Sequence, residues 1–151
     1  MKTPGKMPQR CPACGAVLPE GSDCQALFES FLYLEDTDPA YGEVHFPMVA
    51  TYMVQHGLYS DEALAWIRTM LRAYLDEGIT PAEIRRRAGK SVSSDARTWK
   101  VTRPADAPPL PSIPWSITIA DVARNQHDAE SYQDLVKQWA RATLEEGFSP
   151  G

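Results

Sequence analysis

Apolar side chains recur at helical spacing along several stretches of the chain, and this pattern predicts an all-α fold. In the first stretch, Leu27, Phe31 and Leu34 follow one another at intervals of three or four residues. Ser22 stands where a polar side chain can cap the start of a helix. We therefore expect a first helix over residues 23–35.

A second helical stretch follows after a short turn. Asp38 and Pro39 match the N-cap and the first helical position, so a helix is expected to continue to about His56. Pro47 interrupts this stretch, because its ring removes a backbone donor and clashes with the preceding turn. The sequence predicts either a kink there, or a short turn before residue 46 and a separate helix over residues 47–56.

The remaining helices are signalled by similar features. Ser60 opens a helix that ends at Gly78, Thr80 opens a short one that runs into three arginines, and Thr118 caps a brief helix. A longer last helix carries the apolar positions Tyr132, Leu135, Val136, Trp139 and Ala140. Six helical segments result.

Between these helices the periodicity fails over residues 90–116. This stretch contains PADAPPLPSIPW, which favours an extended and irregular connection. Thr98 to Thr102 is the part of it that fits one short strand.

A length of 151 residues suits a single domain. We expect this order: a flexible lead-in (1–10), a loop (11–24), a helical core (25–89), the connection (90–116) and the C-terminal helices (117–147).

The composition restricts the protein class. Apolar residues make up 43% and charged residues 23%, as in globular proteins. The net charge of −5 argues against a dedicated nucleic-acid binder. The sequence has no apolar run of about 18 residues that would span a membrane, and its start lacks the apolar stretch of a secretory signal. We therefore expect a cytoplasmic protein without a membrane partner.

The three cysteines are the strongest chemical signal. Cys11 and Cys14 form a C-x-x-C pair within CPACG, the knuckle pattern of structural zinc sites, and Cys24 falls in the first turn of the first helix. The loop over residues 11–24 is so rich in proline and glycine that neither helix nor strand is expected in it. A redox dithiol is disfavoured because no strand precedes Cys11, and free thiols because the loop has little else to hold it. We predict one structural Zn²⁺.

The fourth ligand has several candidates. If the first two helices are antiparallel, the C-terminal part of the second lies beside Cys24, which favours His56. His45 lies three turns earlier on roughly the same face and stays the second candidate. His127 is expected on the surface, and a carboxylate is a further alternative. The predicted metal ligands are thus Cys11, Cys14, Cys24 and His56.

Three thiolates favour a structural ion, because catalytic zinc sites keep an open position and usually have fewer thiolates.

Residues 85–103 hold seven basic side chains against one acid. We therefore expect a binding or adaptor module that uses this basic, proline-rich connection to reach a protein partner. The alternative is a small helical zinc-dependent enzyme, with an open metal position or with His45 as a base near Tyr41 and Glu43. The acids at Glu35, Asp36 and Asp38 surround a turn and are interpreted as caps.

Several of these segments together resemble a known family. They are CPACG, Cys24 at a helix start, YGEVHFPMVATYMVQHG, TIADV and the tryptophan of KQWARATLEEG. They resemble an uncharacterised bacterial family catalogued as domain of unknown function 5946. The family pattern matches Cys11, Cys14, Cys24, Tyr41, His45 and His56. The sequence departs from this pattern at Pro47. It also departs at Gly57, a position at which proline is common in the family. The resemblance implies a metal site and supplies no reaction.

Overall fold

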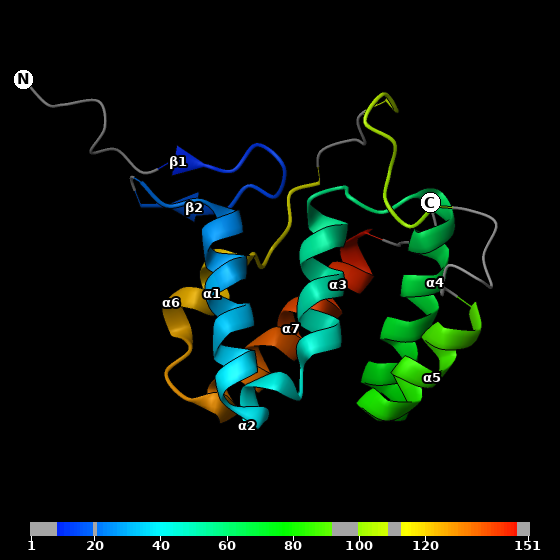
Figure 1. Ribbon diagram of the computed structural model, residues 1–151. Helices are drawn as coiled ribbons and strands as arrows, with labels where there is room; N and C mark the ends of the chain where they lie inside the picture. Colours follow the sequence, from blue (N-terminus) through cyan, green and yellow to red (C-terminus); the bar gives the residue numbers. More distant parts are fainter. Residues whose placement is uncertain (1–8, 20, 92–99, 109–112, 148–151) are drawn as a thin grey trace, which may run out of the picture.

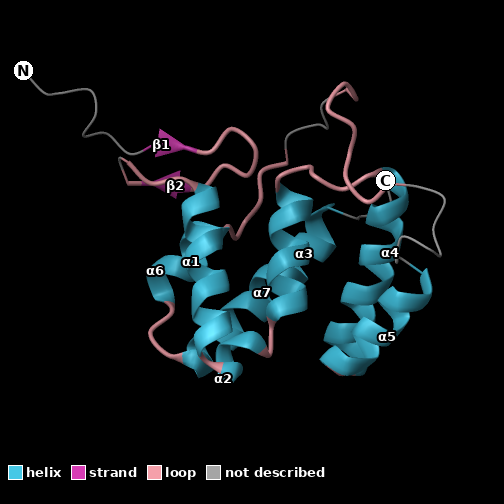
Figure 2. Ribbon diagram, viewed as in Figure 1, coloured by secondary structure: helices cyan, strands magenta, loops and turns pink. Residues whose placement is uncertain are grey.

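A computed structural model describes residues 9–19, 21–91, 100–108 and 113–147 of the chain. Helices dominate this part of the protein, beside one small hairpin (Figures 1 and 2). The seven α-helices described are α1 (Cys24–Thr37), α2 (Pro39–Gly42), α3 (His45–Gln55), α4 (Asp61–Arg72), α5 (Pro81–Ser91), α6 (Ile119–Asn125) and α7 (Ala129–Gly147). Among the described residues, no helix combines the length and the apolar character needed to cross a membrane.

Helix α1 is capped by Asp23, so the prediction of a cap at Ser22 was wrong. The Asp23 carboxylate accepts a hydrogen bond from the Ala26 amide at 2.7 Å. The Ser22 amide instead donates to the Pro19 carbonyl in the preceding turn. As a result Cys24 is the first residue of the helix, where the amide groups carry partial positive charge.

The predicted second helix is two helices, as in the second of the two alternatives, but the later one begins at His45, two residues before the predicted start. Pro47 is the third residue of α3. The first turn of a helix has no intrahelical partners for its amides, so proline fits there without a kink. The described residues therefore contain one more α-helix than the six segments counted without this break.

The later helices begin where the sequence predicted. Ser60 accepts from the Ala63 amide at the start of α4, and Thr80 accepts from the Glu83 amide at the start of α5. A capping box at Thr118 opens α6. After α4 the chain widens into a π-helical turn, η2 (Ala73–Glu77), which ends at the left-handed Gly78.

The N-terminal segment contains two short strands that the sequence did not predict. Strand β1 (Gln9–Arg10) pairs antiparallel with β2 (Val17–Leu18), so residues 9 and 10 are not part of a flexible lead-in. The prolines and glycines that argued against a strand occupy the turn and the flanks of this hairpin instead. Residues 1–8 lie outside the described residues.

The predicted strand near Thr102 is reduced to a single β-bridge with Tyr59. The Ser60 amide donates to the Val101 carbonyl and the Arg103 amide to the Leu58 carbonyl, each at 2.8 Å. Residues 98 and 99 lie outside the described residues. The described parts of the predicted irregular connection contain no helix beyond α5, which runs to Ser91.

The core has two apolar clusters that share α3 and α7. One lies among the hairpin, α1, α3, α6 and α7 and includes Phe31 and Trp139; the other joins α3, α4 and α7 and includes Ile67. Trp115 of the connection packs against both clusters. Figure 1 shows α1 and α3 running in opposite directions, with the hairpin over the start of α1. The start of α1 and the end of α3 thus lie at the same end of the molecule.

Candidate metal centre

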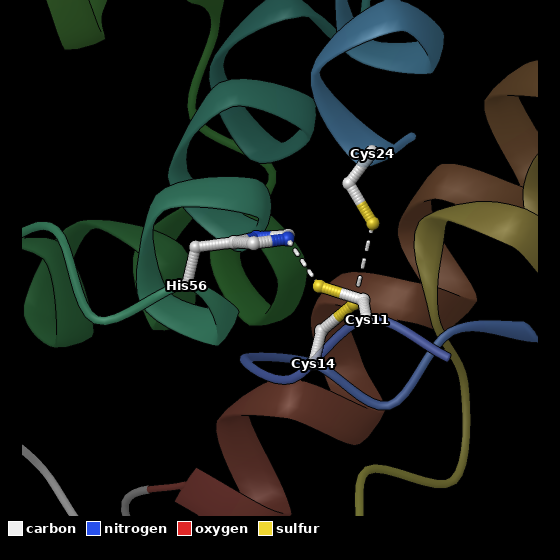
Figure 3. A group of neighbouring side chains, drawn as sticks. All are labelled: Cys11, Cys14, Cys24 and His56. Carbon is white, nitrogen blue, oxygen red and sulfur yellow. Dashed lines mark hydrogen bonds between the residues drawn. The ribbon is translucent and has the colours of Figure 1, made fainter. Parts of the chain in front are cut away.

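Four side chains from three segments converge at this end of the molecule. Their ligand atoms all lie within 4.8 Å of one another: Cys11, Cys14, Cys24 and His56 (Figure 3). The sulfurs of Cys14 and Cys24 are 3.6 Å apart, and the Cys11 sulfur is 3.7 Å from His56 Nε2. Ligands of a tetrahedral zinc ion with bonds of about 2.0–2.3 Å stand about 3.5–3.8 Å apart. The cluster is therefore close enough and suitably spaced to bind a metal ion.

The hairpin turn presents two of the sulfurs. The Gly15 amide donates to the Cys11 carbonyl, and the Cys11 amide donates to the Ala16 carbonyl, both at 2.8 Å. Gly15 has a φ of 81°, a left-handed conformation that glycine adopts without a steric penalty. The Ala16 amide also donates to the Cys14 sulfur. This turn holds Cys11 and Cys14 toward α1.

The charge state of the sulfurs favours a cation. The hydrogen bond from Cys24 lowers the pKa of the Cys14 thiol to about 4 despite burial. The same contact, together with burial, raises the pKa of the Cys24 thiol. Two buried sulfurs this close cannot both carry a negative charge without a compensating positive charge, and a divalent metal ion supplies it.

His56 is held with one nitrogen free for a metal. Its Nδ1 donates to the Tyr52 carbonyl at 2.7 Å, and Nε2 points to the Cys11 sulfur (Figure 3). The imidazole stacks on the Tyr52 ring, which in turn stacks on Phe28, each with ring centroids 4.2 Å apart. Burial would lower the pKa of His56, but the Cys14 sulfur and the Tyr52 carbonyl raise it. A backbone carbonyl on Nδ1 is one of the usual partners of a metal-binding histidine, beside a carboxylate or water.

The structure brings neither of the other two histidines to the sulfurs. His45, the second candidate for the fourth ligand, begins α3 and bonds to Glu35 instead. The His127 side chain is 75% exposed and lies 3.5 Å from the Asp128 carboxylate. The position of His56 at the end of α3, opposite the start of α1, agrees with the antiparallel arrangement predicted from the sequence.

Comparison with known proteins gives one match. The model of a family of unknown function, DUF5946, matches residues 9–147. The chain belongs to this family. The matched region runs from the hairpin to the end of α7 and thus contains all four residues of the cluster. No curated protein and no solved structure matches the chain.

This DUF5946 chain has a second polar cluster that the sequence analysis missed. The Glu35 side chain is only 4% exposed, accepts a hydrogen bond from the Tyr132 hydroxyl, and lies 2.7 Å from His45 Nδ1. His45 was expected near Tyr41 and Glu43, and Glu35 was interpreted as a cap. The spacing along α1 could have predicted that Glu35 is buried. Glu35 lies four residues after Phe31 and so falls on the apolar face of the helix.

The charges in this second cluster compensate one another. A buried carboxylate is costly unless it is paired and hydrogen-bonded, and Glu35 has both kinds of partner. Its hydrogen bond raises the pKa of His45, against a smaller opposing effect of burial. Burial, and then Glu35, raise the pKa of Tyr132. His45 is thus the exposed partner of the buried Glu35 in a hydrogen-bonded pair that becomes an ion pair when the imidazole is protonated.

Proposed function

We propose that Cys11, Cys14, Cys24 and His56 bind one structural Zn²⁺, and that the protein is a zinc-stabilised helical binding module. The observation that supports this most directly is the spacing of the four ligand atoms within 4.8 Å. Thiolates and imidazole select zinc over magnesium or calcium, which prefer oxygen ligands. A reducing compartment such as the cytoplasm would keep the thiols available.

The ion would fasten the N-terminal hairpin to the helices. Two strands of two residues each are too short to be stable alone. The hairpin buries three side chains in the core, and two of them are small: Cys14, Ala16 and Leu18. Where a site is not preformed in the unfolded chain, the free energy of metal binding contributes to folding. The zinc would therefore stabilise this end of the protein.

We propose that the basic, proline-rich connection is the part of the module that binds, and that it binds an unidentified protein partner. Residues 92–99 and 109–112 of this connection lie outside the described residues. Of the basic side chains described, Arg86 and Arg87 both bond to Glu83, and Arg103 lies 3.4 Å from Asp61. These pairs reduce the charge that the segment offers to a partner.

Metal analysis of purified variants tests the zinc site. We expect about one zinc per chain in the native protein. Cys24→Ala and His56→Ala should each retain less zinc and melt at a lower temperature, because each removes a ligand. His127→Ala is the matched control, since it removes an exposed imidazole away from the sulfurs, and should keep both values. A metal-free protein of unchanged melting temperature would rule the proposal out.

The alternative function is that of a small enzyme, with an open metal position or with His45 as a base. The buried Glu35 favours the second form, because a carboxylate on Nδ1 orients an imidazole for proton transfer at its other nitrogen. A base must be unprotonated near neutral pH. If NMR titration shows the His45 ring still fully protonated well above neutral pH, that form of the alternative is excluded.

A further inference from the structure

A cavity of about 320 Å³ lies among α3, α4 and α5. None of the four residues of the metal cluster lines it. Its wall is mainly apolar, with Phe46 and Val49 from α3, Trp66 and Ile67 from α4, and Ile84 from α5. This volume is at the lower end of the range of ligand pockets, about 300–1,000 Å³, which suits a small molecule such as one ring with a short side chain.

An unpaired guanidinium lines the same cavity. Arg85 is exposed and has no ion pair or hydrogen bond among the described residues, whereas Arg86 and Arg87 beside it both bond to Glu83. A guanidinium has parallel N–H groups that match the two oxygens of a carboxylate. Next to an apolar wall, it offers a polar anchor for an otherwise apolar molecule.

His45 supplies a second donor on this wall. Its Nδ1 is engaged by Glu35, and Nε2 has no partner among the described residues. Glu35 raises the pKa of His45, which increases the share of rings that carry an N–H on both nitrogens. Glu43 also lines the cavity and is exposed; its carboxylate repels an anion, so Arg85 and His45 are the lining groups that can hold one.

We propose that this cavity binds a small monocarboxylic acid with a single aryl or short alkyl body. The apolar body lies against Phe46 and Trp66, whose rings meet edge to face with centroids 6.4 Å apart. The carboxylate is held by Arg85 and His45. This inference goes beyond the zinc site, because the two sites share no residue.

Calorimetric titration of the zinc-loaded protein with 3-phenylpropionate tests the proposal. The acid should bind at least about tenfold more tightly than its neutral isostere 3-phenylpropanamide, a difference of about 1.4 kcal/mol. In Arg85→Gln most of this preference for the acid should be lost, because His45 is then the one remaining anchor. Arg86→Gln is the matched control, because it makes the same charge change on the same helix at a residue outside the cavity wall, and it should keep the preference.

A second variant tests the location. Ala88 lines the cavity and is partly buried, so Ala88→Phe should fill the space and abolish binding of both compounds. Circular dichroism and zinc content, measured on the same samples, separate loss of binding from loss of folding or of metal. Equal affinities of acid and amide for the native protein, no binding of either, or an equal effect of the two arginine variants would each overturn the proposal.

Discussion

At the scale of single residues, His56 and His45 use the same nitrogen for different purposes. Each engages Nδ1, His56 with a backbone carbonyl and His45 with the Glu35 carboxylate. A carbonyl fixes the tautomer and leaves Nε2 available for a metal, whereas a carboxylate favours the protonated ring. The two histidines also differ at Nε2, which faces the Cys11 sulfur in His56 and has no partner among the described residues in His45.

Replacing Glu35 with glutamine tests the ion pair. The pKa of His45, raised above its ordinary 6.5 by Glu35, should fall when the charge is removed. Because the folded pKa is the higher one, the stabilising contribution of the pair is present below about pH 6.5 and is lost as pH rises through the folded pKa. The effect on stability should be small, since the His45 side chain is 60% exposed.

NMR titration of His45 and melting curves against pH measure both effects. Glu29→Gln is the control, because Glu29 lies on the exposed side of α1 and bonds to Gln25. It should leave the pKa of His45 unchanged. If Glu35→Gln also leaves this pKa unchanged, the ion pair does not form in solution.

At the scale of elements, helix positions were predictable but their ends were less so. Ser22 and Asp23 are both good N-cap residues, and the choice between them depends on the turn in which the Ser22 amide bonds to Pro19. The break before α3 had no clear local signal, because its N-cap, Val44, makes no side-chain capping bond. Pro47 suggested a break but fits equally well inside a first turn.

The cap of α1 gives a prediction at this scale. Asp23→Ala should lower the free energy of unfolding by about 1 kcal/mol, because it leaves the Ala26 amide without its acceptor. Ser22→Ala, the neighbouring control, should change it by less than about 0.5 kcal/mol. Urea unfolding of the two variants measures both values. A larger loss in Ser22→Ala than in Asp23→Ala would contradict the observed cap.

At the scale of the whole molecule, the four-residue cluster was predictable because it depends on one helix pair. The antiparallel arrangement of α1 and α3 follows from the short connection through α2, and it was enough to favour His56. The cavity beside Trp66 was not predictable, since it depends on how α4 and α5 pack against α3. The hairpin was missed for a related reason: its pairing becomes apparent only with the buried Leu18 and Ala16 in place.

X-ray absorption at the zinc edge of the purified protein would reveal directly which atoms bind the metal. We expect a first shell of three sulfur atoms and one nitrogen atom, with no oxygen ligand. His56→Ala should lose the nitrogen contribution of an imidazole, and His127→Ala should leave the spectrum unchanged. A native shell with fewer than three sulfurs, or with a water ligand in place of the imidazole, would contradict the closed structural site.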